Sequence, residues 1–140
     1  MSLENMLLAR DGSLRISDFG MARRCRADTV FPACGSHTMI GKPAYRAPEC
    51  LEAEWNARSV DIYALGCCLF AMLTSSHLKD KKHKGDQARV YRGRPISEVL
   101  RRRGVVVSRQ AQDLLQGMLA KPSRRLSLEQ VLSHPWLAGL

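Results

Sequence analysis

Two oxygen-bearing side chains stand at the ends of a short segment near the N-terminus. Asn5 precedes an apolar stretch, and Asp18 follows a second stretch in which polar and apolar residues alternate. Asp11-Gly12 lies between the two stretches and is typical of a tight hairpin turn. Because antiparallel strands return the chain to its start, we expect the Asn5 amide and the Asp18 carboxylate to lie on the same side. Hard oxygen ligands of this kind suit Mg²⁺ that is held together with substrate phosphates.

After Asp18, the sequence predicts an irregular loop followed by a short helix. Residues 21–46 show little periodicity and are interrupted by glycine and proline, which predicts a loop. Pro48 follows this loop, and proline is favoured at the first helical position because its missing N–H would be unpaired there anyway. We therefore expect a short helix over residues 48–54.

Two tripeptides bound this loop and carry a family resemblance. Asp18-Phe19-Gly20 precedes the loop, and Ala47-Pro48-Glu49 ends it. In this order and at this separation, they resemble the activation segment of a protein kinase. The implied fold is mainly α: the helical C-terminal lobe of the protein-kinase fold, with a small β-hairpin near the N-terminus. The implied organisation is one partial kinase domain over residues 1–140, with an activation segment at 18–49 and a helical subdomain at 50–140.

The resemblance assigns nucleotide-binding roles to residues of the hairpin. Asn5 and Asp18 correspond to the two residues that hold Mg²⁺ at the ATP phosphates, and Leu7 to the apolar residue under the adenine ring. Phe19 corresponds to a residue that packs into a hydrophobic stack behind the site. The expected cofactors are therefore ATP and Mg²⁺, and the expected partner is a protein substrate.

The resemblance also assigns roles within the loop. Thr38 stands at the spacing of an activating phosphothreonine, and Arg23 matches a basic residue that often pairs with such a phosphate. An upstream activating kinase is thus an expected partner. Lys42 departs from the family, which usually has Thr or Ser there, and Ser2 stands where the family has Lys. The residues assigned to the activation segment are Asp18, Phe19, Gly20, Arg23, Thr38, Lys42, Tyr45, Ala47, Pro48 and Glu49.

Glu49 has an expected partner far along the chain. In the family this glutamate is buried and pairs with an arginine, which corresponds here to Arg125, with Arg124 as the alternative. Such a pair would tie the end of the activation segment to the helical body. Removal of one partner of a buried ion pair costs about 3–5 kcal/mol.

Residues 59–74 predict a buried central helix. Beyond its start, the segment is apolar on every face. We expect Ser59 to cap the helix and Asp61 to lie in its first turn. The pattern Asp61-x-Tyr63-x-x-Gly66 is similar to the central helix of the kinase family, in which the aspartate holds the backbone of the catalytic loop.

The C-terminal third predicts several shorter helices. Residues 75–95 are polar, basic and irregular; a short helix is expected over 96–103, ending at Gly104. Ser108 is expected to cap a helix over 109–120, and Ser127 a last helix that ends at Leu132. The His134-Pro135-Trp136 ending resembles calcium/calmodulin-dependent and related Ser/Thr kinases.

The composition limits the class of protein. The net charge is +9, and residues 79–103 hold ten Lys or Arg against three acids. Such a stretch indicates a solvated surface, an acidic protein partner or a nucleic acid. No run of eighteen apolar residues predicts a membrane span, and the N-terminus does not resemble a signal peptide. Five cysteines without a Cys-x-x-Cys pair favour a reducing compartment, the cytoplasm or the nucleus.

These observations predict a Ser/Thr protein kinase domain, which in its complete form transfers phosphate from Mg-ATP to protein hydroxyls. The catalytic aspartate is expected upstream of Met1, so no catalytic residue is assigned within the chain, and residues 1–140 alone are expected to be inactive. One alternative is a non-catalytic pseudokinase lobe that binds partners. A weaker alternative is a basic nucleic-acid-binding module that uses residues 79–103.

Overall fold

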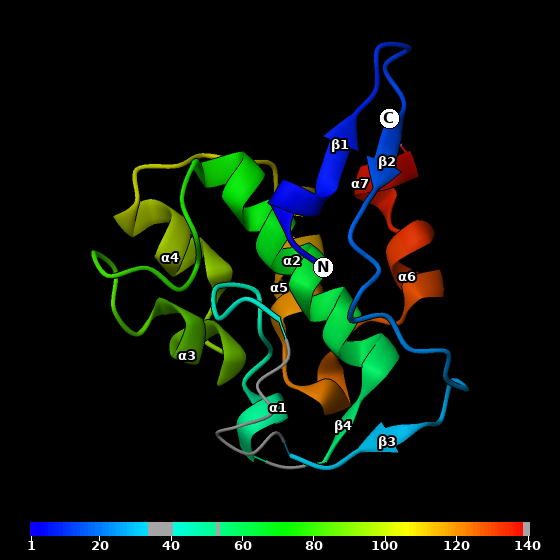
Figure 1. Cartoon of the computed structure of the whole chain (residues 1–140). Coiled ribbons are helices and arrows are strands. Elements are labelled where there is room, and N and C mark those ends of the chain that lie inside the picture. The colour runs from blue at the N-terminus through cyan, green and yellow to red at the C-terminus, as the bar shows by residue number, and fades with distance from the viewer. Residues whose placement is uncertain (34–40, 53, 139–140) are drawn as a thin grey trace.

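The computed structural model describes residues 1–33, 41–52 and 54–138, and it is mainly helical, as predicted (Figure 1). Two short antiparallel strand pairs accompany the helices: β1 with β2, and β3 with β4. The helices are α1 (Glu49–Glu52), α2 (Ala57–Thr74), α3 (Asp86–Tyr91), α4 (Ile96–Arg102), α5 (Arg109–Leu119), α6 (Leu128–Leu132) and α7 (Pro135–Ala138). The strands are β1 (Met6–Leu8), β2 (Leu14–Ile16), β3 (Val30–Phe31) and β4 (Trp55–Asn56), and 3₁₀ turns span Leu3–Asn5 and Pro122–Arg124.

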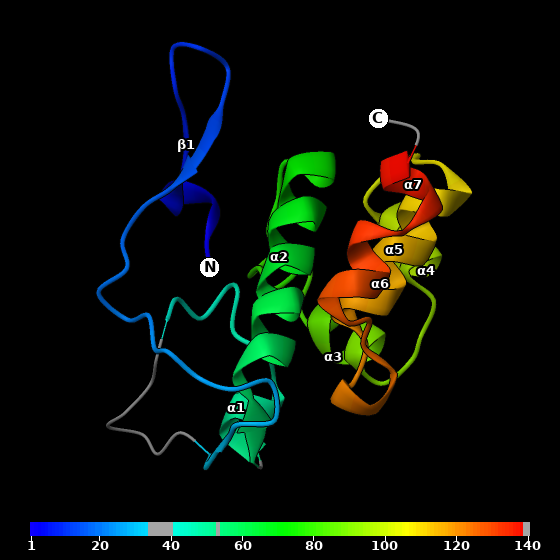
Figure 2. The ribbon, with the colours of Figure 1, turned by 90° about the vertical axis from the view of Figure 1, so that its right-hand side faces the viewer.

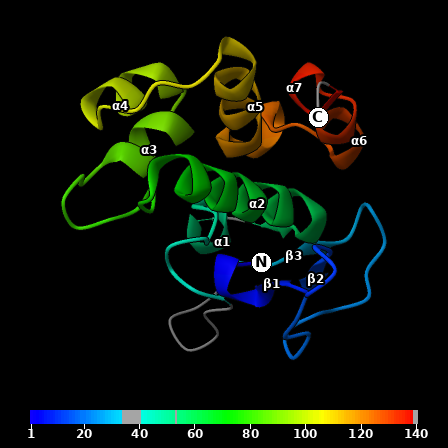
Figure 3. The same ribbon diagram turned by 90° about the horizontal axis from the view of Figure 1, so that it is seen from above.

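Helix α2 is the centre of the domain. It lies between α3 to α7 on one side and the N-terminal segment with α1 on the other (Figures 2 and 3). Its closest neighbour is α5: a Cβ placed on Gly66 would come within 2.9 Å of the Cβ of Met118. A glycine at this point therefore lets the two helix backbones approach, and Tyr63 and Phe70 pack fully buried in the core.

By length and hydropathy alone, α2 could also cross a membrane, and it is the one helix of the described chain with that property. The core helix of a soluble protein passes the same test, and α2 packs here against α5 and the segment around Tyr45. The sequence criterion required eighteen consecutive apolar residues. The polar residues Arg58, Ser59 and Asp61 at the start of α2 interrupt such a run, so the helix did not meet that criterion.

The start of α2 differs from the prediction. Ser59 was expected to cap the helix, but the helix begins at Ala57, and the side chain of Asn56 accepts a hydrogen bond from the Ser59 N–H at 3.0 Å. Asp61 consequently lies beyond the first turn. The amide of Asn56 also donates to the carbonyl of Ala27 at 2.6 Å, so the cap is chosen by a contact with a remote loop. Because Asn56 and Ala27 are far apart in the sequence, no local pattern predicts this contact.

Helix α3 was missed, because residues 75–95 were expected to be irregular. The helix has only six residues, too few to establish a helical period in a basic segment. Tertiary contacts hold it: Val90 is fully buried, and the buried carboxylate of Asp86 receives hydrogen bonds from Arg102 and Arg103 of the α4 end. This buried, hydrogen-bonded ion pair fixes α3 against α4, although the sequence of α3 shows no clear helical period.

The remaining helices follow the predicted pattern with small differences in length. α1 covers Glu49–Glu52 instead of 48–54, and α4 ends at Arg102, with Gly104 in the left-handed region at φ 68°. The Ser108 hydroxyl accepts from the Ala111 N–H at 3.1 Å at the start of α5. Ser127 and Gln130 form a reciprocal capping box at α6. The buried face of α5 contains Ala111, Leu114, Leu115 and Met118.

Candidate functional site

The N-terminal hairpin brings Asn5 and Asp18 together. Strands β1 and β2 pair with Met6 opposite Ile16, and the backbone N–H of Ser17 donates to the Asn5 carbonyl at 2.9 Å. This register places the residues that flank the hairpin next to each other. The Asn5 side-chain amide donates to Asp18 Oδ2 at 3.4 Å. An amide and a carboxylate thus converge at the open end of the hairpin.

Asp18 has an unusual backbone conformation, with φ at 61°. Non-glycine residues seldom adopt this left-handed region, and those that do cluster at functional sites, where the surrounding structure imposes it. The Asp18 side chain is exposed and accepts the hydrogen bond from Asn5. The conformation turns the chain sharply between β2 and Gly20 and leaves the carboxylate open to a ligand.

The donor set fits Mg²⁺ in one particular way. Among the residues that the structure describes, no group of three His, Cys, Asp or Glu side chains could hold a metal ion. Asn5 and Asp18 therefore offer at most two ligand groups from the protein. Mg²⁺ commonly binds through one or two carboxylates and completes its octahedron with phosphate oxygens and water. The donor set of this pair is therefore compatible with Mg²⁺ that arrives together with a phosphate-bearing ligand.

The apolar residues expected at this site are not covered. Leu7 is 51% exposed and Phe19 is 67% exposed. Leu7 could therefore contact an adenine ring from one side. Phe19 belongs to neither apolar cluster of the described residues, so these residues do not form the hydrophobic stack expected around it.

The end of the activation segment is anchored in the core. Tyr45 is buried, and its ring meets the His77 ring edge-on with 5.3 Å between centroids. Burial raises the pKa of the Tyr45 hydroxyl, against a smaller lowering effect of the Leu3 backbone. Ala47 is 1% exposed, and the Gln87 side chain donates to the Arg46 carbonyl at 3.2 Å. Residues 45–48 are thus fixed between the 3₁₀ turn, α2 and α3.

Lys42 contacts the turn that carries Asn5. Its Nζ lies 3.2 Å from Glu4 Oε2, and both side chains are about half exposed. The pKa of Glu4 is lowered, first by its backbone hydrogen bond and to a smaller extent by Lys42. Lys42 thus bridges the activation segment and the turn of Leu3–Asn5. Arg23 is exposed, and Thr38, the predicted phosphorylation site, lies outside the described residues.

Glu49 and Arg125 lie in contact, as the resemblance implied. Arg125 Nη1 is 2.5 Å from Glu49 Oε1, and it also donates to the Ser59 carbonyl at 3.0 Å. The other guanidinium nitrogens donate to the Ala120 carbonyl. The guanidinium carbon stands 4.9 Å from the Tyr63 ring centroid. The alternative partner, Arg124, is exposed. One arginine therefore joins α1, α2 and the end of α5.

Asp61 and Gly66 have different environments on α2. Gly66 lies against α5, as described above. Asp61 is exposed and makes no side-chain hydrogen bond within the described chain. Its pKa is raised, because neighbouring protein atoms partly desolvate the carboxylate. The expected contact between Asp61 and a catalytic-loop backbone is not formed by these residues.

The structure contains a second buried ion-pair network, which the sequence did not predict. Arg103 is almost fully buried; it donates to Asp86 Oδ2 at 3.0 Å and to Asp80 Oδ2 at 3.1 Å, and its guanidinium stands over the Phe70 ring at 4.9 Å. His83 Nδ1 lies 3.1 Å from Asp80 Oδ2. The only sequence signal was three acids within a strongly basic stretch. Two of them, Asp80 and Asp86, form ion pairs with Arg102 and Arg103.

Comparisons with known proteins identify a family for this chain. The sequence profile of the protein kinase domain family matches residues 1–137. The putative serine/threonine-protein kinase YPL150W of Saccharomyces cerevisiae is 33% identical over 139 residues, and the probable serine/threonine-protein kinase MARK-B of Dictyostelium discoideum is 33% identical over 142 residues. Testis-specific serine/threonine-protein kinase 1 of Homo sapiens is 30% identical over 139 residues. Each match covers 98% of this chain but only 14%, 19% and 37% of the respective relative.

Proposed function

Because this chain belongs to the protein kinase family, we propose that it is the C-terminal lobe of a Ser/Thr kinase that transfers phosphate from Mg-ATP to protein hydroxyls in the complete protein. The observation that carries the proposal is the contact between the Asn5 amide and the Asp18 carboxylate at the open end of the hairpin. The similarity to serine/threonine-protein kinases supports the choice of hydroxyl substrate.

The residues of this chain would act by positioning and by charge. Asn5 and Asp18 would hold Mg²⁺, which neutralises the negative charge on the transferring phosphoryl group. Leu7 would contact the adenine ring. Gly41, Lys42 and Pro43 would receive the protein substrate, since they are exposed and immediately precede the buried anchor at Tyr45. The Glu49–Arg125 pair would keep this segment in place against α2.

We propose further that residues 1–140 alone do not transfer phosphate. The sequence contains no His-Arg-Asp triplet and no Gly-rich loop, and phosphoryl transfer depends on groups that position and stabilise the reacting oxygens. The proposal places the catalytic aspartate outside these residues. Turnover by purified residues 1–140 would contradict it.

The test of the nucleotide site uses the full-length protein and the variant Asp18→Asn. This change keeps the shape of the side chain but removes its charge. We expect Mg-dependent ATP binding, measured by calorimetry, and phosphoryl transfer both to fall by roughly a hundredfold or more. Asp28→Asn, an exposed change in the loop before β3, serves as the control. Unchanged Mg-dependent binding in Asp18→Asn would remove the proposed metal role.

One observation favours a second candidate, a non-catalytic lobe that binds partners. Lys42, where the family has a hydroxyl residue, is paired with Glu4 beside Asn5. In a pseudokinase, Lys42→Thr would leave the full-length protein without kinase activity. In an active kinase, Lys42→Thr would retain or raise activity. Activity of the unaltered full-length protein would exclude this candidate.

We place the protein in a reducing compartment, the cytoplasm or the nucleus. Cys25, Cys50, Cys67 and Cys68 are all free thiols in the described part of the chain, which supports this placement. An upstream activating kinase acting on Thr38, and the absence of membrane contact, are proposals of the same kind. Phosphopeptide mass spectrometry of the protein from cells would test the first of them.

A further inference from the structure

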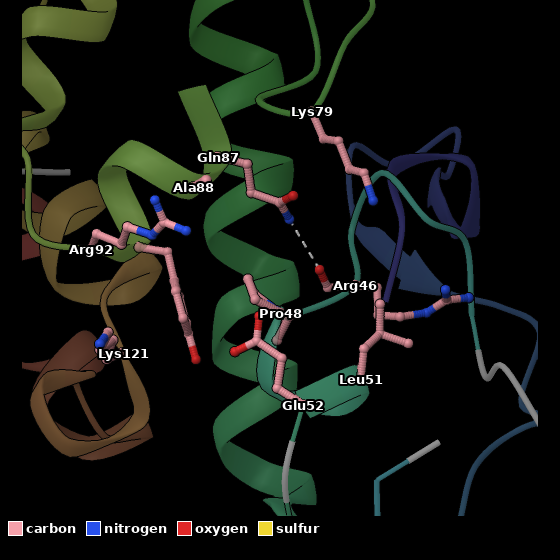
Figure 4. Close-up of a pocket in the computed structure, with 11 residues that line it drawn as sticks. Arg46, Pro48, Leu51, Glu52, Lys79, Gln87, Ala88, Arg92 and Lys121 are labelled. Carbon is pink, nitrogen blue, oxygen red and sulfur yellow. Dashed lines mark hydrogen bonds between the residues drawn. The ribbon is translucent and has the colours of Figure 1, made fainter. Parts of the chain in front are cut away.

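Two adjoining hollows flank α3. The first, of about 310 Å³, lies between α1, α3 and Lys121, and we call it the α1–α3 pocket (Figure 4). The second, of about 760 Å³, lies between Pro43 and residues 77–85. Lys79, Gln87 and Ala88 line both, so the two hollows form one groove. Their sizes are those of ligand-binding clefts.

Positively charged side chains from separate segments line this groove. Lys79 follows α2, Arg92 ends α3, and Lys121 follows α5 (Figure 4). Neither Lys79 nor Arg92 forms an ion pair with another described residue. Glu52 is the only acidic side chain among the described residues of the α1–α3 pocket. By contrast, Arg103 is neutralised by buried Asp86. The groove therefore keeps an excess of positive charge at a concave surface, where the field is focused.

Part of the lining of the groove is apolar. Pro48, Ala88 and Tyr91 line it together with Leu51, which is 47% exposed. The Lys121 ammonium stands 6.0 Å from the Tyr91 ring centroid, which leaves this ring half-buried beneath a cation. Apolar surface rimmed by cations suits a ligand that carries both an apolar side chain and several negative charges.

We propose that this groove binds an acidic segment of a protein partner. Carboxylates of the segment would lie near Lys79, Arg92 and Lys121, and an apolar side chain would pack on Leu51. Lys81 and Lys84 line the second hollow, so the cations extend along the groove instead of gathering around one point, as a single phosphate would require. The one aromatic side chain of the α1–α3 pocket, Tyr91, already lies beneath Lys121, so base stacking of a nucleic acid has no free platform.

This inference goes beyond the proposed phosphoryl transfer and is tested without ATP or Mg²⁺. The probe is a fluorescein-labelled peptide rich in Glu and Asp with one central Leu, and its control is the same peptide with Gln and Asn. Binding to the chain is measured by fluorescence anisotropy over a range of salt concentrations. The acidic peptide is expected to bind with an affinity that falls with salt, and the neutral peptide is expected not to bind.

The decisive variant is Lys79→Gln with Arg92→Gln and Lys121→Gln. A control with the same change of charge carries Arg10→Gln, Arg24→Gln and Arg109→Gln, which are all exposed and do not line the groove. The groove variant is expected to weaken binding of the acidic peptide roughly tenfold or more, and the control variant less than threefold. Circular dichroism establishes that both are folded; if the triple variant is not, Arg92→Gln alone replaces it, with Arg109→Gln as its control.

Three outcomes would overturn the inference. Equal loss of affinity in the two variants would show that only net charge attracts the peptide. Equal binding of the acidic and neutral peptides would show that charge has no role. Binding of a phosphopeptide or a short RNA through the groove, with no binding of the acidic peptide, would assign the groove to a different partner.

Discussion

Arg125 and Glu49, which are 76 positions apart in the sequence, meet with Nη1 and Oε1 at 2.5 Å and with both side chains almost fully buried. This contact closes the chain around α2, because Glu49 begins α1 and Arg125 follows the turn after α5. The guanidinium also donates to Ser59 and Ala120. A single side chain therefore connects α1 with α2 and the end of α5.

Loss of this arginine should be costly. We expect Arg125→Ala to lower the free energy of unfolding by about 3–5 kcal/mol, because Glu49 would remain buried without a charge partner. Urea unfolding followed by circular dichroism measures this quantity. The neighbouring Arg124→Ala is the control, and it should cost less than about 0.5 kcal/mol because Arg124 is exposed. Equal effects of the two changes would contradict the assignment of the pair.

Gly66 should not tolerate a side chain. A Cβ at this position would lie 2.9 Å from the Cβ of Met118 and 3.1 Å from Leu119 Cδ2. Overpacking of this kind costs about 1–3 kcal/mol, whereas alanine in a helix gains at most about 1 kcal/mol over glycine. We expect Gly66→Ala to be net destabilising in thermal unfolding. Gln110→Ala, on the exposed side of α5, should be close to neutral or slightly stabilising, and a stabilising Gly66→Ala would show that the helices can separate freely.

Asp80 should make stability depend on acid pH. Burial raises the pKa of its carboxyl, but hydrogen bonds from His83 and the charge of Arg103 outweigh this effect and hold the pKa below 3.8. A depressed folded-state pKa contributes stability above the unfolded value, and this contribution is lost as pH falls through the folded pKa. Asp80→Asn should therefore lose less stability than the unaltered protein as the pH falls through and below 3.8.

Urea unfolding at a series of pH values measures this difference. Lys81→Gln changes a neighbouring charge without removing a carboxyl group, so it should keep the pH dependence of the unaltered protein. A parallel pH profile for Asp80→Asn would show that the carboxyl group has no role in acid unfolding.

Cys67 should resist alkylation in the folded state. Burial raises its pKa to about 12, and that of the adjacent Cys68 to about 11, so both thiols are neutral at pH 8 as well as inaccessible. The thiolate is the reactive form, and we expect iodoacetamide at pH 8 to modify both only after unfolding. Cys25, which is partly exposed, serves as the internal comparison. Mass spectrometry of native and denatured samples would show the order in which the cysteines are alkylated. Rapid modification of Cys67 in the native sample would contradict the prediction, because it would show that α2 opens.

Local signals in the sequence determined the parts of this protein that depend on neighbouring residues. Asp11-Gly12 between two short stretches predicted the hairpin and therefore the meeting of Asn5 and Asp18. Ser108 and Ser127 marked helix starts because their hydroxyls bond to backbone N–H groups three residues later. The family resemblance added the Glu49–Arg125 contact, which no local pattern contains.

Only the tertiary structure decided features that rest on contacts between distant residues. Asn56 caps α2 in place of Ser59 because the loop at Ala27 fixes its amide, and α3 forms because Arg103 and Asp86 meet in the interior. Lys42 pairs with Glu4, and Lys79, Arg92 and Lys121 line one groove. Helical period and capping report on a few successive residues, whereas burial and charge pairing depend on the path of the whole chain.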